Sequence, residues 1–240
     1  MTNLPLDQQN NRLAVLFDLD GTLVDPAGGI TQGIAYALQS MALPVPEQDI
    51  LNAMVGPKLS EGLLALPNFP ADKLSAVVAA YREWYSARGI AMGRPYPGMV
   101  ELLETLRRRG FLIGLATQKP LSLARVLLDT HGLSGFFQAV SGAAENEALN
   151  TADSLPPKQR IIETALEELS SPPRAIMVGD RAHDVLGARA NGLDCLGVNW
   201  GFSATGELEK AGAIHTVDSA EELLARISEY FALEVANGSL

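Results

Sequence analysis

The sequence predicts an α/β protein with a doubly wound parallel sheet and an all-helical segment inserted after the first strand. Beyond about residue 98, short continuous apolar runs alternate with stretches of helical spacing. Apolar strands between amphipathic helices are typical of a parallel sheet covered on both faces. Between residues 26 and 94 the spacing is helical, and no alternating strand pattern is seen. We therefore assign residues 12–25 and 95–233 to the core, 26–94 to the insert, and 1–11 and 234–240 to flexible tails.

The first strand is predicted at the apolar run Leu13–Leu16, and two carboxylates, Asp18 and Asp20, follow it. Side chains at i and i+2 of a strand share a face, so both carboxylates should converge above one edge of the sheet. Carboxylates this close repel each other unless a cation or a shared proton relieves them. The pair suits covalent catalysis, in which one carboxylate is the nucleophile and the other carries a proton. The alternative is an acidic turn that only ends the strand.

Three stretches of the insert place apolar residues at helical intervals. They are Ile34, Ala37, Leu38 and Met41; Leu59, Leu63 and Leu64; and Leu74, Val77, Val78, Tyr81, Trp84 and Tyr85. The insert has roughly 70 residues, which is near the lower size of an independent domain. Pro and Gly residues in Asp25–Gly29 and Arg94–Gly98 predict hinges where the insert joins the core.

The later elements alternate as a parallel sheet requires. The predicted helices are Met99–Arg109, Leu121–Asp129, Lys158–Leu169, Asp184–Ala190 and Ala220–Phe231, and the predicted strands are Phe111–Ala116, Phe137–Val140, Ala175–Val178, Cys195–Val198 and Ile214–Val217. Residues Glu145–Pro157 are predicted to form a loop. In open parallel sheets ligands bind beyond the carboxyl ends of the strands, so the residues that follow each strand are the candidates for a site.

Composition and charge limit the possible partners. The chain has 240 residues, 47% of them hydrophobic, so a substantial core is expected. Its 18 Lys and Arg against 28 Asp and Glu give a net charge of -10, which argues against nucleic acid and anionic membranes. The start of the chain has no signal-peptide pattern, and the single cysteine, Cys195, reads as a buried thiol. We expect a cytoplasmic protein, either a monomer or a homodimer, that acts on a small molecule.

The strand that ends at Ala116 is followed by Thr117, Gln118, Lys119 and Pro120. A hydroxyl beside the free amides of a helix N-terminus, with a proline suited to its first turn, can bind phosphate. The alternative is that Thr117 only caps the helix.

A second acidic pair follows the strand that ends at Val178. Asp180 leaves this strand and Asp184 enters the next helix, so both can point back at the first pair. Three or four carboxylates on one edge require a hard cation, and ligation by oxygen alone suits Mg²⁺. We expect His183 to lie beside the site rather than to be a ligand. Asp184 could instead only be a helix N-terminal residue favoured by the dipole.

Lys158 opens its predicted helix. A cation in the first turn opposes the helix dipole at a cost of about 0.3–1 kcal/mol, which a function would explain. Lys119 is the alternative lysine.

Jointly these residues resemble the motifs of the haloacid dehalogenase-like superfamily of phosphotransferases. The matching motifs are Asp18-x-Asp20-Gly21-Thr22, Thr117, Lys158 and Gly179-Asp180-x-x-x-Asp184. The resemblance covers nearly the whole chain beyond residue 12 and implies a Rossmann-like core, with the insert similar to the helical cap of subclass I. Further segments resemble the 5′-nucleotidase and phosphoglycolate-phosphatase-like branch: Val55-Gly56-Pro57, Tyr96-Pro97-Gly98, His183-Asp184-Val185-x-Gly187-Ala188 and Asn191-Gly192.

The resemblance also implies a role for each residue. Asp18 would attack phosphorus and become an aspartyl phosphate, while Asp20 would protonate the leaving oxygen and then activate water. Thr117 and Lys158 would hold the phosphoryl oxygens, together with Gln118, which stands where asparagine or serine is common. The implied Mg²⁺ ligands are the carboxylates of Asp18 and Asp180 and the backbone carbonyl of Asp20, with Asp184 nearby or acting through water. Lys58 is the candidate substrate contact in the cap, and a solvated surface lysine is the alternative.

These roles predict a Mg²⁺-dependent phosphatase that hydrolyses a small phosphomonoester, either a nucleoside 5′-monophosphate or a phosphoglycolate-like molecule. One alternative is a phosphoglucomutase-like phosphoryl transferase, which would keep Asp20 but shield its phosphoenzyme from water. A second, of a different class, is a receiver-type switch that accepts a phosphoryl group without turnover.

Overall fold

A six-stranded parallel sheet forms the centre of the molecule. The computed structural model describes residues 12–26, 28–144 and 157–237. The strands are β1 (Leu13–Phe17), β4 (Leu112–Pro120), β5 (Ala139–Ala143), β6 (Arg174–Gly179), β7 (Asp194–Val198) and β8 (His215–Val217). Their order is β5-β4-β1-β6-β7-β8, and every neighbouring pair is parallel. The predicted α/β class with a doubly wound sheet is confirmed.

Alternate residues of β1 enter two different cores because successive strand side chains point to opposite faces. Val15 and Phe17 pack in one cluster, and Ala14 and Leu16 pack in the other. Helices α6 (Met99–Arg108), α7 (Leu121–Thr130) and α11 (Ala220–Asn237) cover the first face, and α8 (Pro157–Glu168), α9 (Ala182–Ala190) and α10 (Glu207–Ala211) cover the second. Burial on both faces explains why the strands are continuously apolar.

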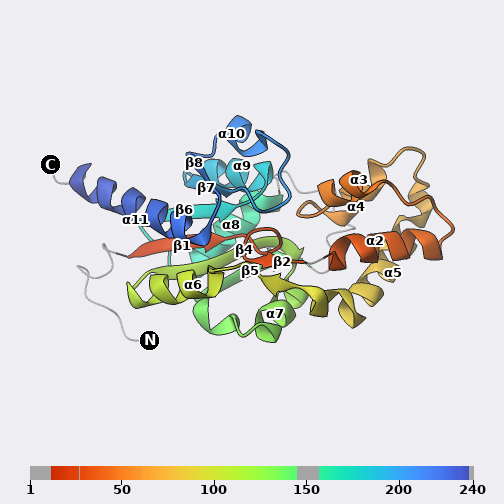
Figure 1. Ribbon diagram of the computed structural model, residues 1–240, viewed down its shortest axis with the longest axis horizontal. Coiled ribbons are helices and arrows are strands. Elements are labelled where there is room, and N and C mark those ends of the chain that lie inside the picture. Colours follow the sequence, from red (N-terminus) through yellow and green to blue (C-terminus); the bar gives the residue numbers. More distant parts are fainter. Residues whose placement is uncertain (1–11, 27, 145–156, 238–240) are drawn as a thin grey trace.

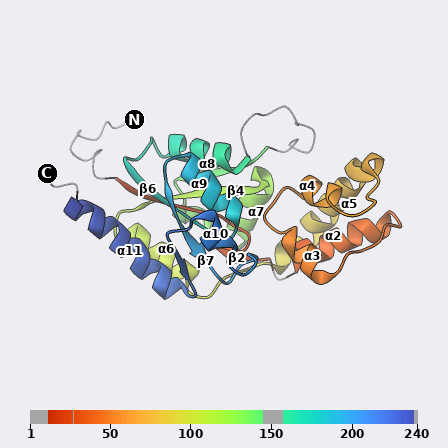
Figure 2. The same ribbon diagram turned by 90° about the horizontal axis from the view of Figure 1, so that it is seen from above.

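The inserted helices lie together at one end of the molecule, at the right of Figure 1. They are α2 (Gly29–Ser40), α3 (Gln48–Ala53), α4 (Leu59–Leu64) and α5 (Leu74–Ala87), with short 3₁₀ turns at Ala71–Lys73 and Gly89–Met92. Figure 2 shows the same separation from above. Val77, Val78 and Tyr85 of α5 are buried, which confirms the helical stripe predicted there.

The two connections between insert and core run side by side. β2 (Val24–Asp25) and β3 (Arg94–Pro95) form a short antiparallel pair, in which Asp25 lies opposite Arg94. These strands are too short to show a sequence pattern, and the Pro and Gly residues around them predicted only hinges here.

Several boundaries differ from the prediction. β4 continues past Ala116 to Pro120, with an irregularity in its pairing to β5 between Thr117 and Pro120. The residue before a proline is disfavoured in the helical region, so Lys119 stays extended, and α7 begins at Leu121 as predicted. The 3₁₀ turn Ser134–Phe136 stands before β5, which runs from Ala139 to Ala143 rather than over 137–140.

The helix predictions need smaller corrections. α3 and α10, six and five residues long, were not predicted because, unlike the equally short α4 with Leu59, Leu63 and Leu64, they carry fewer than three large apolar residues at helical intervals. α11 continues to Asn237, so residues 234–237, assigned above to the tail, are helical; Glu234 and Ala236 are good helix formers. Residues 1–11 and 238–240, and the predicted loop apart from Pro157, lie outside the described residues. No helix in the described ranges has the length and apolar character needed to cross a membrane.

Candidate active site

The first acidic pair sits where β1 ends, beside β6. Phe17 lies opposite Val178, and the backbone N–H of Asp18 donates to the Val178 carbonyl at 2.9 Å, which anchors Asp18 next to the end of β6. Gly21 then turns the chain with a φ of +90°, and a Cβ at this position would come within 2.3 Å of a carboxylate oxygen of Asp180. Glycine is therefore required for the turn and for the close approach of the two acidic motifs.

Asp180 is fully buried at the end of β6 and is held at both oxygens. The Thr22 hydroxyl donates to Oδ1 at 3.2 Å, and the Phe202 backbone N–H donates to Oδ2 at 2.8 Å. Two fixed donors orient the carboxylate toward the end of β1. The loop after β7 thus contributes to the site through its backbone, which no side-chain motif could signal.

Asp184, in the first turn of α9, both interacts with the N-terminus of its helix and faces the first acidic pair. Its Oδ2 accepts the backbone N–H of Arg181 at 3.0 Å, as a residue at a helix N-terminus does, while its Oδ1 lies 2.5 Å from the ammonium of Lys158. The two oxygens are thus divided between the helix terminus and the site.

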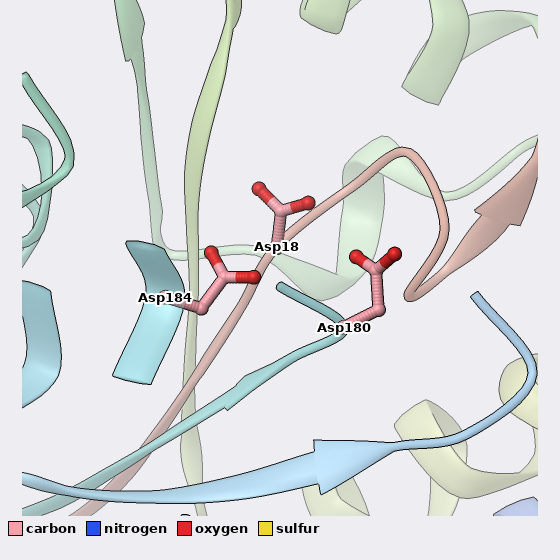
Figure 3. A group of neighbouring side chains, drawn as sticks. All are labelled: Asp18, Asp180 and Asp184. Carbon is pink, nitrogen blue, oxygen red and sulfur yellow. The ribbon is translucent and has the colours of Figure 1, made fainter. Parts of the chain in front are cut away.

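Asp18, Asp180 and Asp184 form one buried cluster, with one ligand atom of each within 4.8 Å of the others. Figure 3 shows their carboxyl groups side by side. Burial is the main cause that raises the pKa of Asp18, against the attraction of Lys158, and repulsion from Asp184 raises it further. Burial and repulsion from Asp184 and Asp18 raise the pKa of Asp180 as well. One lysine cannot neutralise three buried carboxylates, so this oxygen-only set fits a divalent hard cation such as Mg²⁺.

Lys158, the predicted lysine, reaches two of these three carboxylates. Its ammonium lies 2.6 Å from Asp18 Oδ1 and 2.5 Å from Asp184 Oδ1, and the side chain is 2% exposed. Burial alone would lower the pKa of Lys158, but the two carboxylates raise it above its ordinary value. Lys158 is therefore positively charged in the site.

Lys119, considered above only as an alternative to Lys158, has a site of its own. Its buried ammonium lies 2.8 Å from Asp20 Oδ2 and donates to the hydroxyl of Tyr85 at 2.7 Å. Burial is the main cause that raises the pKa of Asp20, and Lys119 opposes that rise. Asp20 Oδ1 is also buried but has no hydrogen-bond partner within the described residues. One oxygen of Asp20 is thus fixed, and the other is left for a ligand.

A cavity of about 110 Å³ opens over the first acidic pair, between core and insert. From the core it is lined by Asp18, Asp20, Thr117, Gln118 and Lys119, and from the insert by Lys58, Ser60, Arg82 and several apolar side chains, including Ile30, Ile34, Met54 and Val78. Thr117, which is 2% exposed, accepts the backbone N–H of Lys119 at 3.2 Å.

Two core side chains hold the insert against this cavity. The Gln118 amide donates to the Gly56 carbonyl at 3.1 Å, so it reaches the insert rather than only the cavity. Arg181 donates to the Val55 carbonyl at 2.5 Å and pairs with Glu207 at 3.0 Å. Both receiving carbonyls belong to the segment Val55-Gly56-Pro57.

His183 lies next to the cluster, with Nε2 3.7 Å from Asp184 Oδ1. Burial, followed by the charge of Lys158, lowers the pKa of His183 to about 3, so the ring is neutral at pH 7.

Comparisons with known proteins agree with this site. Residues 15–198 match the family model described as haloacid dehalogenase-like hydrolase. The chain is 37% identical over 216 residues to a protein of Mycobacterium tuberculosis named tyrosine-protein kinase PtkA, covering 88% of this chain and 72% of the relative. It is 34% identical over 202 residues to the 5′-nucleotidase of Pseudomonas aeruginosa, covering 84% and 89%.

A solved structure described as a predicted phosphatase from Clostridium acetobutylicum has a TM-score of 0.81 with this chain. It is 36% identical in sequence, and the match covers 91% of this chain and 98% of that one. The sequence match across both acidic motifs and the matching fold lead to one conclusion: the chain belongs to the haloacid dehalogenase-like hydrolase family.

Proposed function

We propose that the chain is a Mg²⁺-dependent phosphatase that hydrolyses a small phosphomonoester through an aspartyl-phosphate intermediate on Asp18. The observation that carries the proposal is the pairing of Asp18 with Lys158 beside Asp20, whose Oδ1 has no partner among the described residues. A nucleophile held by a cation and an acid–base group with one open oxygen are the two groups that this chemistry needs.

In the first half of the proposed reaction, an Asp18 oxygen attacks phosphorus while the bond from phosphorus to the leaving oxygen breaks. Asp20, protonated at Oδ1, gives its proton to that oxygen. In the second half, Asp20 takes a proton from water as the water oxygen attacks phosphorus and releases Asp18. Thr117 and Lys158 hold the phosphoryl oxygens throughout. These fixed donors act where charge develops, in a buried setting.

The carboxylates of Asp18 and Asp180 and the backbone carbonyl of Asp20 would hold Mg²⁺, with Asp184 adjacent. The bound metal would neutralise negative charge on the transferring phosphoryl group. The buried acidic cluster supports this assignment, because the cluster contains more negative charge than Lys158 can balance.

Residues 26–94 would act as the cap and select the leaving group. The cavity of about 110 Å³ is smaller than the roughly 300–1,000 Å³ of pockets that take drug-sized ligands. That favours a phosphoglycolate-sized ester over a nucleoside monophosphate, which would require the cap to stand further open. The apolar side chains of α2 and α5 in the cavity favour a leaving group with exposed carbon atoms.

The proposal is tested by hydrolysis of p-nitrophenyl phosphate with Mg²⁺ and with EDTA, followed by a panel of small phosphomonoesters and nucleoside monophosphates. Metal-dependent turnover that is faster on the small esters is expected. A folded protein without turnover on any ester would contradict the proposal.

A phosphoryl transferase is the second candidate, because a relative at 37% identity is named a tyrosine-protein kinase. Radiolabelled ATP incubated with a tyrosine-containing peptide separates the two functions. Label on the peptide would support a transferase, and label only in inorganic phosphate would support hydrolysis.

A further inference from the structure

The ammonium of Lys119 joins two parts of the molecule. Its partner in the core is Asp20 Oδ2, at 2.8 Å, and its partner in the insert is the hydroxyl of Tyr85 on α5, at 2.7 Å. Lys119 is 8% exposed and Tyr85 is 1% exposed. Water therefore does not compete well for either contact, and both remain in place while the insert is docked.

The hydroxyl of Tyr85 can accept a hydrogen bond from the Lys119 ammonium. Burial, followed by repulsion from Asp20, raises the pKa of Tyr85, so the phenol stays neutral and its oxygen can accept the bond. The ammonium also lies 4.4 Å from the centre of the Tyr85 ring, within the range of a cation–π contact. The ring stacks on Tyr81 at 5.6 Å, and Tyr81 lines the cavity. This part of α5 is therefore continuous with the wall of the site.

The contact sets the orientation of Asp20. A lysine side chain has many rotamers, and its compact ammonium does not by itself fix a carboxylate plane. The Tyr85 hydroxyl restricts that freedom, because it holds the ammonium at a second point besides Asp20 Oδ2. With Oδ2 fixed in this way, Oδ1 remains unpaired among the described residues. The direction of this open oxygen thus depends on a residue of the insert.

We propose that Lys119 is a positioning residue which, through Tyr85, makes the alignment of Asp20 depend on the docking of α5. The proposal rests on the proposed function of Asp20 as the proton carrier. It adds that the insert, besides covering the cavity, completes the catalytic geometry.

The test compares two esters in Lys119→Met and Tyr85→Phe. p-Nitrophenolate leaves without a proton, whereas an alkoxide needs one, so misalignment of Asp20 should slow transfer of the phosphoryl group to Asp18 from an alkyl phosphate but not from p-nitrophenyl phosphate. This first step is compared through kcat/KM, because the later hydrolysis of the aspartyl phosphate, which also uses Asp20, is common to both esters. General acid catalysis contributes about 10²–10⁴-fold, so the ratio of kcat/KM for the alkyl ester to kcat/KM for the aryl ester should fall about 100-fold in Lys119→Met. Tyr85→Phe should lower the same ratio about 3–10-fold, the effect of one hydrogen bond.

Three further variants calibrate this ratio. Asp20→Asn gives the largest fall that loss of the proton carrier can produce. Lys210→Met and Tyr36→Phe make the same chemical changes at exposed positions of the core and of the insert and should leave the ratio unchanged. In the double variant, Tyr85→Phe should have no further effect once Lys119 is methionine. Equal loss of kcat/KM on both esters, or additive effects of the two substitutions, would overturn the proposal in favour of a purely structural ion pair.

A second measurement does not depend on activity. Tyr85→Phe should lower the melting temperature of the wild-type protein but not that of Lys119→Met. If the effect of Tyr85→Phe on the melting temperature depends on Lys119 but no ester is hydrolysed, the proposed function is contradicted and the contact between Lys119 and Tyr85 is supported. If esters are hydrolysed but the effect of Tyr85→Phe does not depend on Lys119, only the proposed role of that contact is overturned. If Lys119→Met does not fold, Tyr85→Phe, which keeps the packed ring, carries the ester comparison by itself.

Discussion

Lys158 and Lys119 each pair with one carboxylate of the first acidic motif, but in different surroundings. Lys158 lies among three carboxylates, and its two partners, Asp18 and Asp184, are both core residues. Lys119 has one carboxylate partner and one hydroxyl partner from the insert. The surroundings of Lys158 are therefore independent of the insert, while those of Lys119 include it. The comparison teaches that Asp18 and Asp20, the proposed nucleophile and the proposed proton carrier, are stabilised by different parts of the fold although they lie two residues apart.

The largest expected effect on turnover comes from replacing Asp18, the partner of Lys158. Asp18→Asn should lower turnover of p-nitrophenyl phosphate by at least about 10⁴-fold, because it removes the nucleophile on which the proposed reaction depends. Asp194→Asn, at an exposed position, is the matched control and should keep full activity. Substantial turnover in Asp18→Asn would mean that the chemistry does not pass through this residue.

The two lysines can be compared directly by removing each charge. Lys158→Met leaves three buried carboxylates without their cation and should cost about 3–5 kcal/mol of unfolding free energy in metal-free protein. Added Mg²⁺ should recover part of this loss, since it replaces the missing charge. For Lys119→Met, which leaves one buried carboxylate that is not among the proposed carboxylate ligands of the metal, Mg²⁺ should recover less. Urea denaturation with and without Mg²⁺ measures how much unfolding free energy each variant recovers. Equal recovery in Lys158→Met and Lys119→Met would contradict the distinction drawn between the surroundings of the two lysines.

Magnesium should stabilise the protein in a pH-dependent way. Because the pKa values of Asp18 and Asp180 are raised in the folded state, these groups stabilise the metal-free fold when protonated. That stability is lost as pH rises from the ordinary value of 3.8 through the raised values. Mg²⁺ competes with those protons, so its effect should grow over the same window.

The size of that effect follows from mass action. At 100 times its dissociation constant, Mg²⁺ adds about 2.7 kcal/mol at pH 7.5, or about 5–10 °C in melting temperature, and less at pH 5. Differential scanning calorimetry at both pH values measures this shift, and Asp180→Asn should abolish it. An equal shift at both pH values would contradict the titration argument.

The smallest expected effect is at the contact between Gln118 and the insert. Gln118→Ala removes one hydrogen bond to Gly56 and should lower kcat/KM about 2–10-fold. Inhibition by inorganic phosphate distinguishes the two roles considered for this residue. An unchanged inhibition constant supports a contact that holds the insert, and weaker inhibition supports a direct contact with phosphate.

The acidic residues could be located from the sequence because local rules are enough to place them. The i, i+2 spacing put Asp18 and Asp20 on one face, and the carboxyl-end rule brought Asp180 and Asp184 to the same edge. Parallel pairing of β1 with β6 then placed the two motifs side by side. None of these steps needs knowledge of how distant helices pack.

The Lys119 link could not be found in this way. The extended backbone before Pro120 directs the Lys119 side chain, and the sequence analysis ended that strand too early, at Ala116. Tyr85 was recognised only as one apolar position of a helical stripe, because its hydroxyl has a role only once α5 is docked on the core. The contacts of Arg181 and Gln118 with the insert were missed for the same reason. Contacts between the insert and the core depend on the relative placement of the two, which periodicity does not report.

The short antiparallel pairing of β2 with β3 affects how readily the inserted segment could be replaced by another. Asp25 and Arg94 lie opposite each other, so the chain leaves the core and returns to it at neighbouring points. Any helical segment whose ends meet at that spacing could replace residues 26–93 without altering the order of the central strands, because loop length adds little entropic cost once the ends are joined. On the proposed roles of the insert and of Tyr85, substrate preference could be exchanged as a unit, provided that the new segment supplies a hydroxyl to the position now taken by Tyr85.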